Sequence, residues 1–114
     1  MASASVADRL DHMLRSIAAI EGYWAGKSLA DFGSNEPYRA ATERHLLIIA
    51  EAARFVPDTA RASTPQIPWK DIIGIGNILR HAYDIIDDRR IWEVVQNDLA
   101  ALKAAVESIR SGYG

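Results

Sequence analysis

Apolar residues recur at the three- and four-residue spacing that marks one buried face of a helix. The clearest stripe consists of Val6, Leu10, Met13, Ile17, Ile20 and Trp24. This stripe predicts a first helix over residues 6–24. Gly22, Gly26 and the segment 31–35 are predicted to break it, because glycine and short polar residues favour turns.

Three more helices are predicted by the same spacing. The second runs from about Pro37 to Val56 behind a cap at Ser34 or Asn35, and Pro57 ends it. Its predicted buried stripe is Tyr38, Ala41, His45, Ile48 or Ile49, Ala52 and Phe55. Pro68 is placed to start the third helix, and Asp87 or Asp88 can cap a fourth that continues to Ile109.

Four amphipathic helices without an alternating strand pattern predict an all-α fold, an antiparallel up-and-down four-helix bundle. A short extra helix fits the proline-rich connection, at Asp58 to Arg61. With 114 residues, the chain has enough length for one core but not for two. We therefore expect a single domain over residues 1–114.

Charge and composition narrow the classes of function. The formal net charge is −2, from 13 basic and 15 acidic residues, so nucleic acid could be attracted only by a local basic patch. With no Cys and three scattered His, neither a metal site nor a cofactor is expected. No apolar run has the length of a membrane span, and the first residues do not resemble a signal peptide. The expectation is a cytoplasmic protein without a membrane partner.

Residues 76–83, Gly-Asn-Ile-Leu-Arg-His-Ala-Tyr, place polar groups in an otherwise apolar helix. Arg80 offers a fixed cation, and His81 a group that exchanges protons near neutral pH. With Asn77 and Tyr83 nearby, this set suits phosphate chemistry. The residues alone also allow a structural interpretation, in which Arg80 pairs with Asp84, His81 is partly exposed and Tyr83 belongs to the core.

Two other features could serve the same site. Arg44 and Glu51 are seven residues apart on one helix face, where they could line a groove or form a solvated edge. Gly74 and Gly76 lie inside the third helix, where each costs about 1 kcal/mol against alanine. Their presence indicates a close approach of a helix or a second subunit.

Several blocks of the chain together resemble the HepT-like family of the HEPN superfamily. They are residues 44–53 (Arg-His-Leu-Leu-Ile-Ile-Ala-Glu-Ala-Ala), 67–74 (Ile-Pro-Trp-Lys-Asp-Ile-Ile-Gly), the set Asn77, Leu79, His81 and Tyr83, and 91–95 (Ile-Trp-Glu-Val-Val). The resemblance covers about residues 5–109. It favours the functional interpretation of residues 76–83.

The resemblance implies the toxin of a toxin–antitoxin pair, a metal-independent endoribonuclease that works as a homodimer with its cleft where two bundles meet. It also implies an antitoxin partner, an MntA-like minimal nucleotidyltransferase that adds AMP to Tyr83. Our leading hypothesis assigns proton transfer to His81, phosphate binding to Arg80 and its orientation to Asn77. Arg44 and Glu51 would line the cleft.

One position departs from the family's pattern. The ribonuclease motif places an Arg directly before the Asn, and that position is Gly76 here. Arg80, one turn later, projects from nearly the same side of the helix and could supply the missing charge. The alternative is a catalytically inactive HEPN module that binds a nucleotidyltransferase partner or a nucleotide.

Overall fold

The computed structural model describes residues 5–113, except for the side chain of Tyr83, and this part of the chain is helical without a strand. Its elements are α1 (Val6–Trp24), α2 (Leu29–Ser34), α3 (Glu36–Ala53), α4 (Asp58–Ala62), α5 (Trp69–His81), the 3-10 helix η1 (Tyr83–Ile85), α6 (Asp88–Asn97) and α7 (Leu99–Ser111). The all-α prediction is confirmed, and α4 is the short extra helix in the proline-rich connection.

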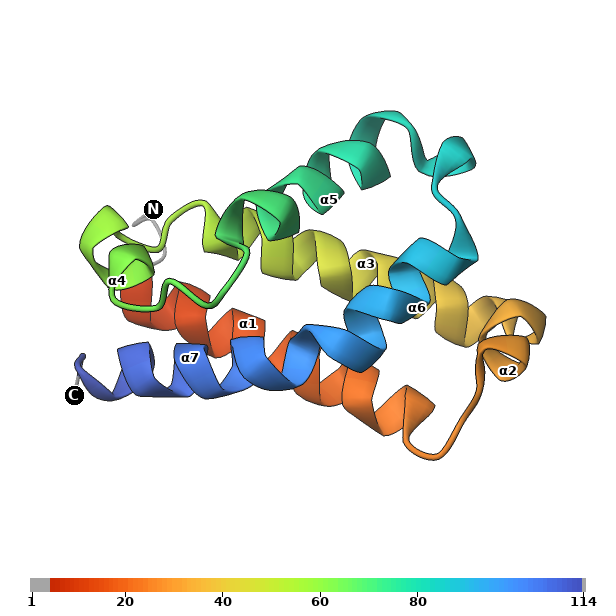
Figure 1. Cartoon of the computed structure of the whole chain (residues 1–114), viewed down its shortest axis with the longest axis horizontal. Helices are drawn as coiled ribbons and strands as arrows, with labels where there is room; N and C mark the ends of the chain where they lie inside the picture. Colours follow the sequence, from red (N-terminus) through yellow and green to blue (C-terminus); the bar gives the residue numbers. More distant parts are fainter. Residues whose placement is uncertain (1–4, 114) are drawn as a thin grey trace.

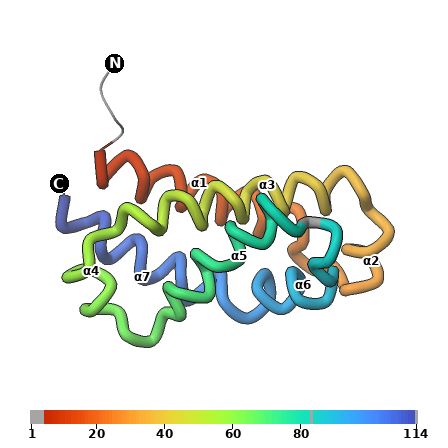
Figure 2. Tube along the Cα trace, turned by 90° about the horizontal axis from the view of Figure 1, so that it is seen from above, coloured from red at the N-terminus to blue at the C-terminus, as the bar shows by residue number. Residues whose placement is uncertain are grey.

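Helix α3 lies between α1 and α5 and contacts both along much of its length (Figures 1 and 2). Helix α7 runs beside α1, while α6 packs on α2 and α7. Along the chain α1, α3 and α5 alternate in direction (Figure 1). This order brings one face of α3 against α5 and leaves another along α1.

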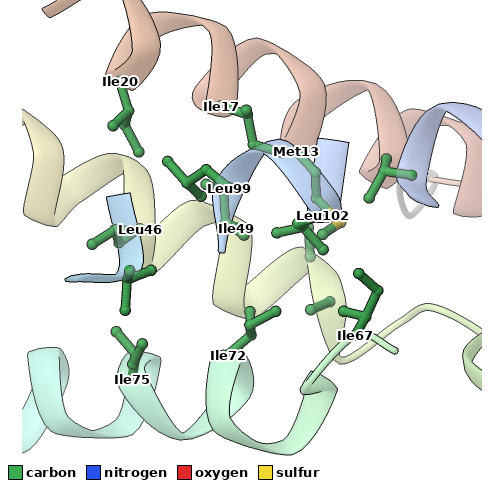
Figure 3. Close-up of a cluster of buried hydrophobic side chains, with 14 of the residues drawn as sticks. Met13, Ile17, Ile20, Leu46, Ile49, Ile67, Ile72, Ile75, Leu99 and Leu102 are labelled. Carbon is green, nitrogen blue, oxygen red and sulfur yellow. The ribbon is translucent and has the colours of Figure 1, made fainter. Parts of the chain in front are cut away.

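The core fills the space between α1, α3, α5 and α7 (Figure 3). The predicted stripe of α1 is confirmed from Leu10 to Trp24, while Val6 is only partly buried at the edge. Burial of these apolar side chains is the main favourable contribution to folding, at roughly 25 cal/mol per Å² of apolar surface.

The predicted stripe of the second helix is wrong at its ends. Tyr38 is 46% exposed and Phe55 is 50% exposed, whereas Thr42 is fully buried. Burial of Thr42 is possible because its hydroxyl group has two hydrogen-bond partners. It accepts a hydrogen bond from Trp24 Nε1 (2.7 Å) and donates one to the Tyr38 carbonyl (2.7 Å). The buried face of α3 is therefore turned relative to the predicted one.

Two predicted elements have different boundaries. Residues 31–34, part of the segment 31–35 that was expected to form a break, lie in helix α2, because Ser28 and Asp31 form a capping box and Phe32 is fully buried beside Trp24. The fourth predicted helix is divided at Asp98 into α6 and α7. No helix in residues 5–113 has the length and apolar character needed to span a membrane.

The Trp24–Thr42 hydrogen bond permits a direct stability test. Trp24→Phe removes the donor and leaves a fully buried hydroxyl with one partner fewer, so we expect a loss of about 1–3 kcal/mol. Urea unfolding followed by circular dichroism measures this loss. Trp92→Phe is the matched control, since Trp92 is partly buried and its indole donates no hydrogen bond within the described residues. Equal losses in the two variants would contradict a role for the hydrogen bond.

Candidate active site

Helices α3 and α5 come close together at Gly76. A Cβ atom added to Gly76 would lie 2.6 Å from the Cβ of Ala50, far inside van der Waals contact, whereas one added to Gly74 would meet no atom within 4 Å. The close helix approach expected from the glycine pair therefore occurs at Gly76. At the position where the resemblance expects an Arg, the chain has a buried packing residue.

Arg80 lies one turn beyond Gly76, on the side of α5 that faces α3. Its guanidinium forms a salt bridge with Glu51 of α3 and donates a hydrogen bond to Asn77 Oδ1 of its own helix. The Arg80 side chain is 29% exposed. The alternative pairing of Arg80 with Asp84 does not occur, because η1 begins after α5 ends at His81.

A cleft of about 240 Å³ opens beside this ion pair. It is lined by Arg9, His12, Arg44, Leu47, Ile48, Glu51, Ala52 and Arg80. Helices α1, α3 and α5 thus contribute three guanidinium groups and one imidazole, against one carboxylate. At its α1 side the Arg9 guanidinium lies 3.4 Å from the centre of the Phe55 ring, a cation–π contact that holds it in place.

The structure brings together some of the predicted site residues but not all. Arg44, Glu51 and Arg80 line one cleft, and Asn77 joins them through Arg80. His81 is exposed at the last residue of α5 and does not line this cleft. The modification predicted for Tyr83 falls on a side chain outside the described part of the structure.

The cleft suits an anion better than a metal ion. Its three arginines and one histidine are surrounded by a protein whose net charge is −2, so the positive field is local. Arginine presents a planar fork of donors that matches the oxygens of a phosphate group. Within residues 5–113, no group of three or more His, Asp or Glu side chains is arranged to hold a metal ion.

Sequence reasoning did not find Arg9 and His12 as cleft residues. Both come from α1, where the apolar stripe predicts which residues are buried but not which residues at its edge line a cleft. Their three-residue spacing on one side of that stripe is the signal that could have shown them. Pairing them with α3 also required knowledge of which flank of α1 faces Arg44.

In comparisons with known proteins, the chain is similar to proteins whose names describe them as ribonucleases. The family described as ribonuclease HepT-like matches residues 13–109. A Methanocaldococcus jannaschii protein named as a putative RNase is 38% identical over 79 residues, covering 69% of this chain and 72% of the relative. A Thermococcus cleftensis protein named "Probable ribonuclease HepT" is 31% identical over 103 residues, covering 90% of this chain and 94% of the relative. No solved structure gives a significant match.

Proposed function

Since the chain belongs to the ribonuclease HepT-like family, we propose that it is an endoribonuclease that cleaves RNA without a metal ion. The observation that carries this proposal is Arg80, whose guanidinium is held by Glu51 and Asn77 at a cleft lined with two further arginines. His81 follows directly on the same helix. The sequence supplies a phosphate binder and a proton carrier side by side.

The proposed reaction is an internal transfer at phosphorus. The RNA 2′-oxygen attacks the adjacent phosphorus, the bond to the 5′-oxygen breaks, and a 2′,3′-cyclic phosphate and a 5′-hydroxyl are formed. His81 takes part in proton transfer, either by accepting the proton of the attacking 2′-hydroxyl or by donating one to the leaving 5′-oxygen. Arg80 stabilises the charge that builds on the non-bridging oxygens in the transition state.

Arg80 can bind Glu51, Asn77 and phosphate together. A guanidinium has five N–H donors; one on Nη1 faces Glu51 and one on Nη2 faces Asn77. The remaining donors stay available to a phosphate in the cleft. Glu51 and Asn77 therefore act as positioning residues that fix the fork, which lowers the entropy lost when substrate binds.

The test of this function compares two oligonucleotides in the presence of a chelator. We expect the purified protein to cleave a single-stranded RNA and to leave products that end in a cyclic phosphate. A chain of the same sequence with 2′-deoxy sugars should remain intact, because it has no attacking hydroxyl. Mass spectrometry of the products identifies the cyclic ends. Cleavage of both chains, or of neither, would contradict the proposal.

Arg80→Lys tests whether cleavage needs the planar guanidinium group of Arg80 or only its positive charge. Lysine keeps the positive charge but is a point donor on a flexible stem and cannot hold Glu51 and Asn77 at once. We expect kcat for RNA cleavage to fall roughly tenfold, equivalent to about 1.4 kcal/mol of transition-state stabilisation. Arg90→Lys, on the exposed side of α6, is the matched control. An Arg80→Lys variant as active as that control would contradict a role for the guanidinium fork.

Gly76 favours a second candidate function. Because the expected Arg is replaced by a residue packed on Ala50, the chain could instead be a catalytically inactive HEPN module that binds a nucleotidyltransferase or nucleotide. RNA binding without cleavage in the oligonucleotide test would favour this candidate. Arg80, which contacts Glu51 and Asn77 beside His81, is the reason that we place the ribonuclease first.

The scaffold that we propose is one HEPN domain over residues 1–114, an up-and-down four-helix bundle with α6 and α7 together as its fourth member.

We propose that this protein dimerises near His81. The large apolar side chains of Ile78 and Ile85, on either side of His81 in the sequence, are 41% and 76% exposed, so a second copy that covered them would bury apolar surface. Such a contact would also bring a second Arg80 and His81 to the site. Sedimentation that finds only monomer at micromolar concentration would contradict this arrangement.

The regulation that we propose places this protein in the cytoplasm as a toxin, paired with an MntA-like nucleotidyltransferase. The Tyr83 hydroxyl would attack the α-phosphorus of ATP, so that AMP is transferred and pyrophosphate leaves. Its support is the place of Tyr83 in the sequence, two residues after His81. After coexpression with an active partner, mass spectrometry should find AMP on Tyr83. An unmodified Tyr83 would contradict this scheme.

A further inference from the structure

A second cavity extends the Arg80 cleft along the boundary between α1 and α3. Its volume is about 380 Å³, and it is lined by His12, Arg15, Ser16, His45 and Ile48. His12 and Ile48 also line the cleft at Arg80, so the two cavities adjoin at these side chains, and we call them together the α1–α3 groove. From Arg9 to Ser16 the groove follows α1 for roughly 10 Å, at about 1.5 Å per residue.

Arginine side chains line both parts of this groove. Arg9, Arg44 and Arg80 lie in its first part and Arg15 in its second, with His12 between them. Glu51 is the single carboxylate in either lining, and it already pairs with Arg80. In a protein of net charge −2, this concentration of arginine marks a site for an extended anion.

The arginines differ in how firmly they are engaged. Arg80 is paired with Glu51, and Arg9 lies over Phe55. Arg15 and Arg44 are exposed, and neither forms a salt bridge with any residue in the described part of the chain. Their guanidinium groups are thus available for an external ligand.

Hydrogen bonds between side chains hold the far end of the groove in place. The half-buried His45 has its Nδ1 3.0 Å from Ser16 Oγ and its Nε2 3.4 Å from the Tyr23 hydroxyl. Ser16 is itself 3% exposed. These contacts fix the imidazole between α1 and α3, so the groove keeps its shape beyond Arg15.

We propose that the α1–α3 groove binds the phosphates of a single-stranded RNA beside the bond that is cleaved, with Arg15 and Arg44 as the phosphate contacts. The proposal rests on the proposed ribonuclease function and identifies where its substrate extends on one chain. An RNA backbone is the extended anion that this function supplies. A positively charged groove that follows the backbone is a common way to hold single strands without reading their sequence.

The test measures binding separately from cleavage. The probe is a fluorescently labelled single-stranded RNA of about 12 nucleotides with 2′-O-methyl groups, which lacks the attacking hydroxyl and stays intact. Anisotropy gives the dissociation constant for the full chain and for Arg15→Gln, Arg44→Gln and the double variant at several salt concentrations. Arg90→Gln makes the same charge change on exposed α6 and is the matched control.

Each single groove variant is expected to weaken binding roughly threefold to tenfold at low salt. It should also reduce the slope of log affinity against log salt concentration by about 0.7, the value for one phosphate contact on a single strand, and the double variant by about twice that. Arg90→Gln should leave the slope unchanged. Arg44→Lys and Arg15→Lys, which keep the charge, should recover most of the affinity.

The opposite results overturn the proposal. Groove variants that bind like Arg90→Gln would show that the phosphates lie elsewhere, even if the protein cleaves RNA. Equal losses in all three single variants would show that only the overall charge matters. If the wild type binds RNA through Arg15 and Arg44 but does not cleave it, the ribonuclease function fails and the groove assignment stands.

Discussion

His81→Ala is expected to reduce RNA cleavage by about 10²- to 10⁴-fold, the range that general acid–base catalysis contributes. Alanine cannot exchange a proton with the attacking or leaving oxygen. Because His81 is exposed at the end of α5, its removal should leave the free energy of unfolding almost unchanged. Single-turnover cleavage measures the loss, and urea unfolding checks that the fold is intact. Added imidazole should restore part of the activity.

His12→Ala is the informative comparison, since His12 lines the Arg80 cleft while His81 does not. We expect this variant to retain most of its single-turnover rate. If His12→Ala lost the activity and His81→Ala kept it, the proton carrier would be on α1. The assignment of His81 would then be wrong, although the Arg80 cleft would remain the site.

Gly76→Arg, which restores the residue expected by the resemblance, should damage the protein instead of improving it. The first side-chain atom would lie 2.6 Å from the Cβ of Ala50, and a long charged chain would follow it into the contact between α3 and α5. Overpacking and burial of the charge together are expected to cost about 3 kcal/mol or more. Against a typical total stability of about 5–15 kcal/mol, this loss is severe. Urea unfolding measures it.

Further substitutions at Gly74, Gly76 and Ala50 test whether the contact with Ala50 causes the loss of stability. Gly74→Ala should gain up to about 1 kcal/mol from helix propensity, because its Cβ would meet no atom within 4 Å. Gly76→Ala should instead lose about 1–2 kcal/mol. Combined with Ala50→Gly, the Gly76→Ala loss should be relieved, giving a coupling energy in the double-mutant cycle. A stabilised Gly76→Ala would show that the helices separate easily.

Helix type was predictable because the apolar spacing is a local signal. The α1 stripe from Leu10 to Trp24 follows from spacing alone. The rotation of α3 does not, because it depends on a hydrogen bond between Trp24 and Thr42, which are 18 residues apart. Helix α2 was missed for a related reason, since Gly33 suggested a break while the burial of Phe32 stabilises the helix.

The candidate site was only partly visible in the sequence. Arg80, His81 and Asn77 stand within five residues, so their chemistry could be recognised together. Arg9 and His12 could not be joined to them, because their nearness to Arg44 and Arg80 arises from α1 and α5 packing on opposite sides of α3. Long-range packing determines the charge of the cleft, and the spacing of a single helix carries no information about it.

The contact between Gly76 and Ala50 also constrains how this site can evolve. With two small residues facing each other, α3 and α5 have closed over the space that a side chain at position 76 would need. A single mutation that placed Arg there is expected to cost stability, whatever it added to phosphate binding. Stronger phosphate binding at the candidate site is therefore expected to come from substitutions around Arg80, not from position 76.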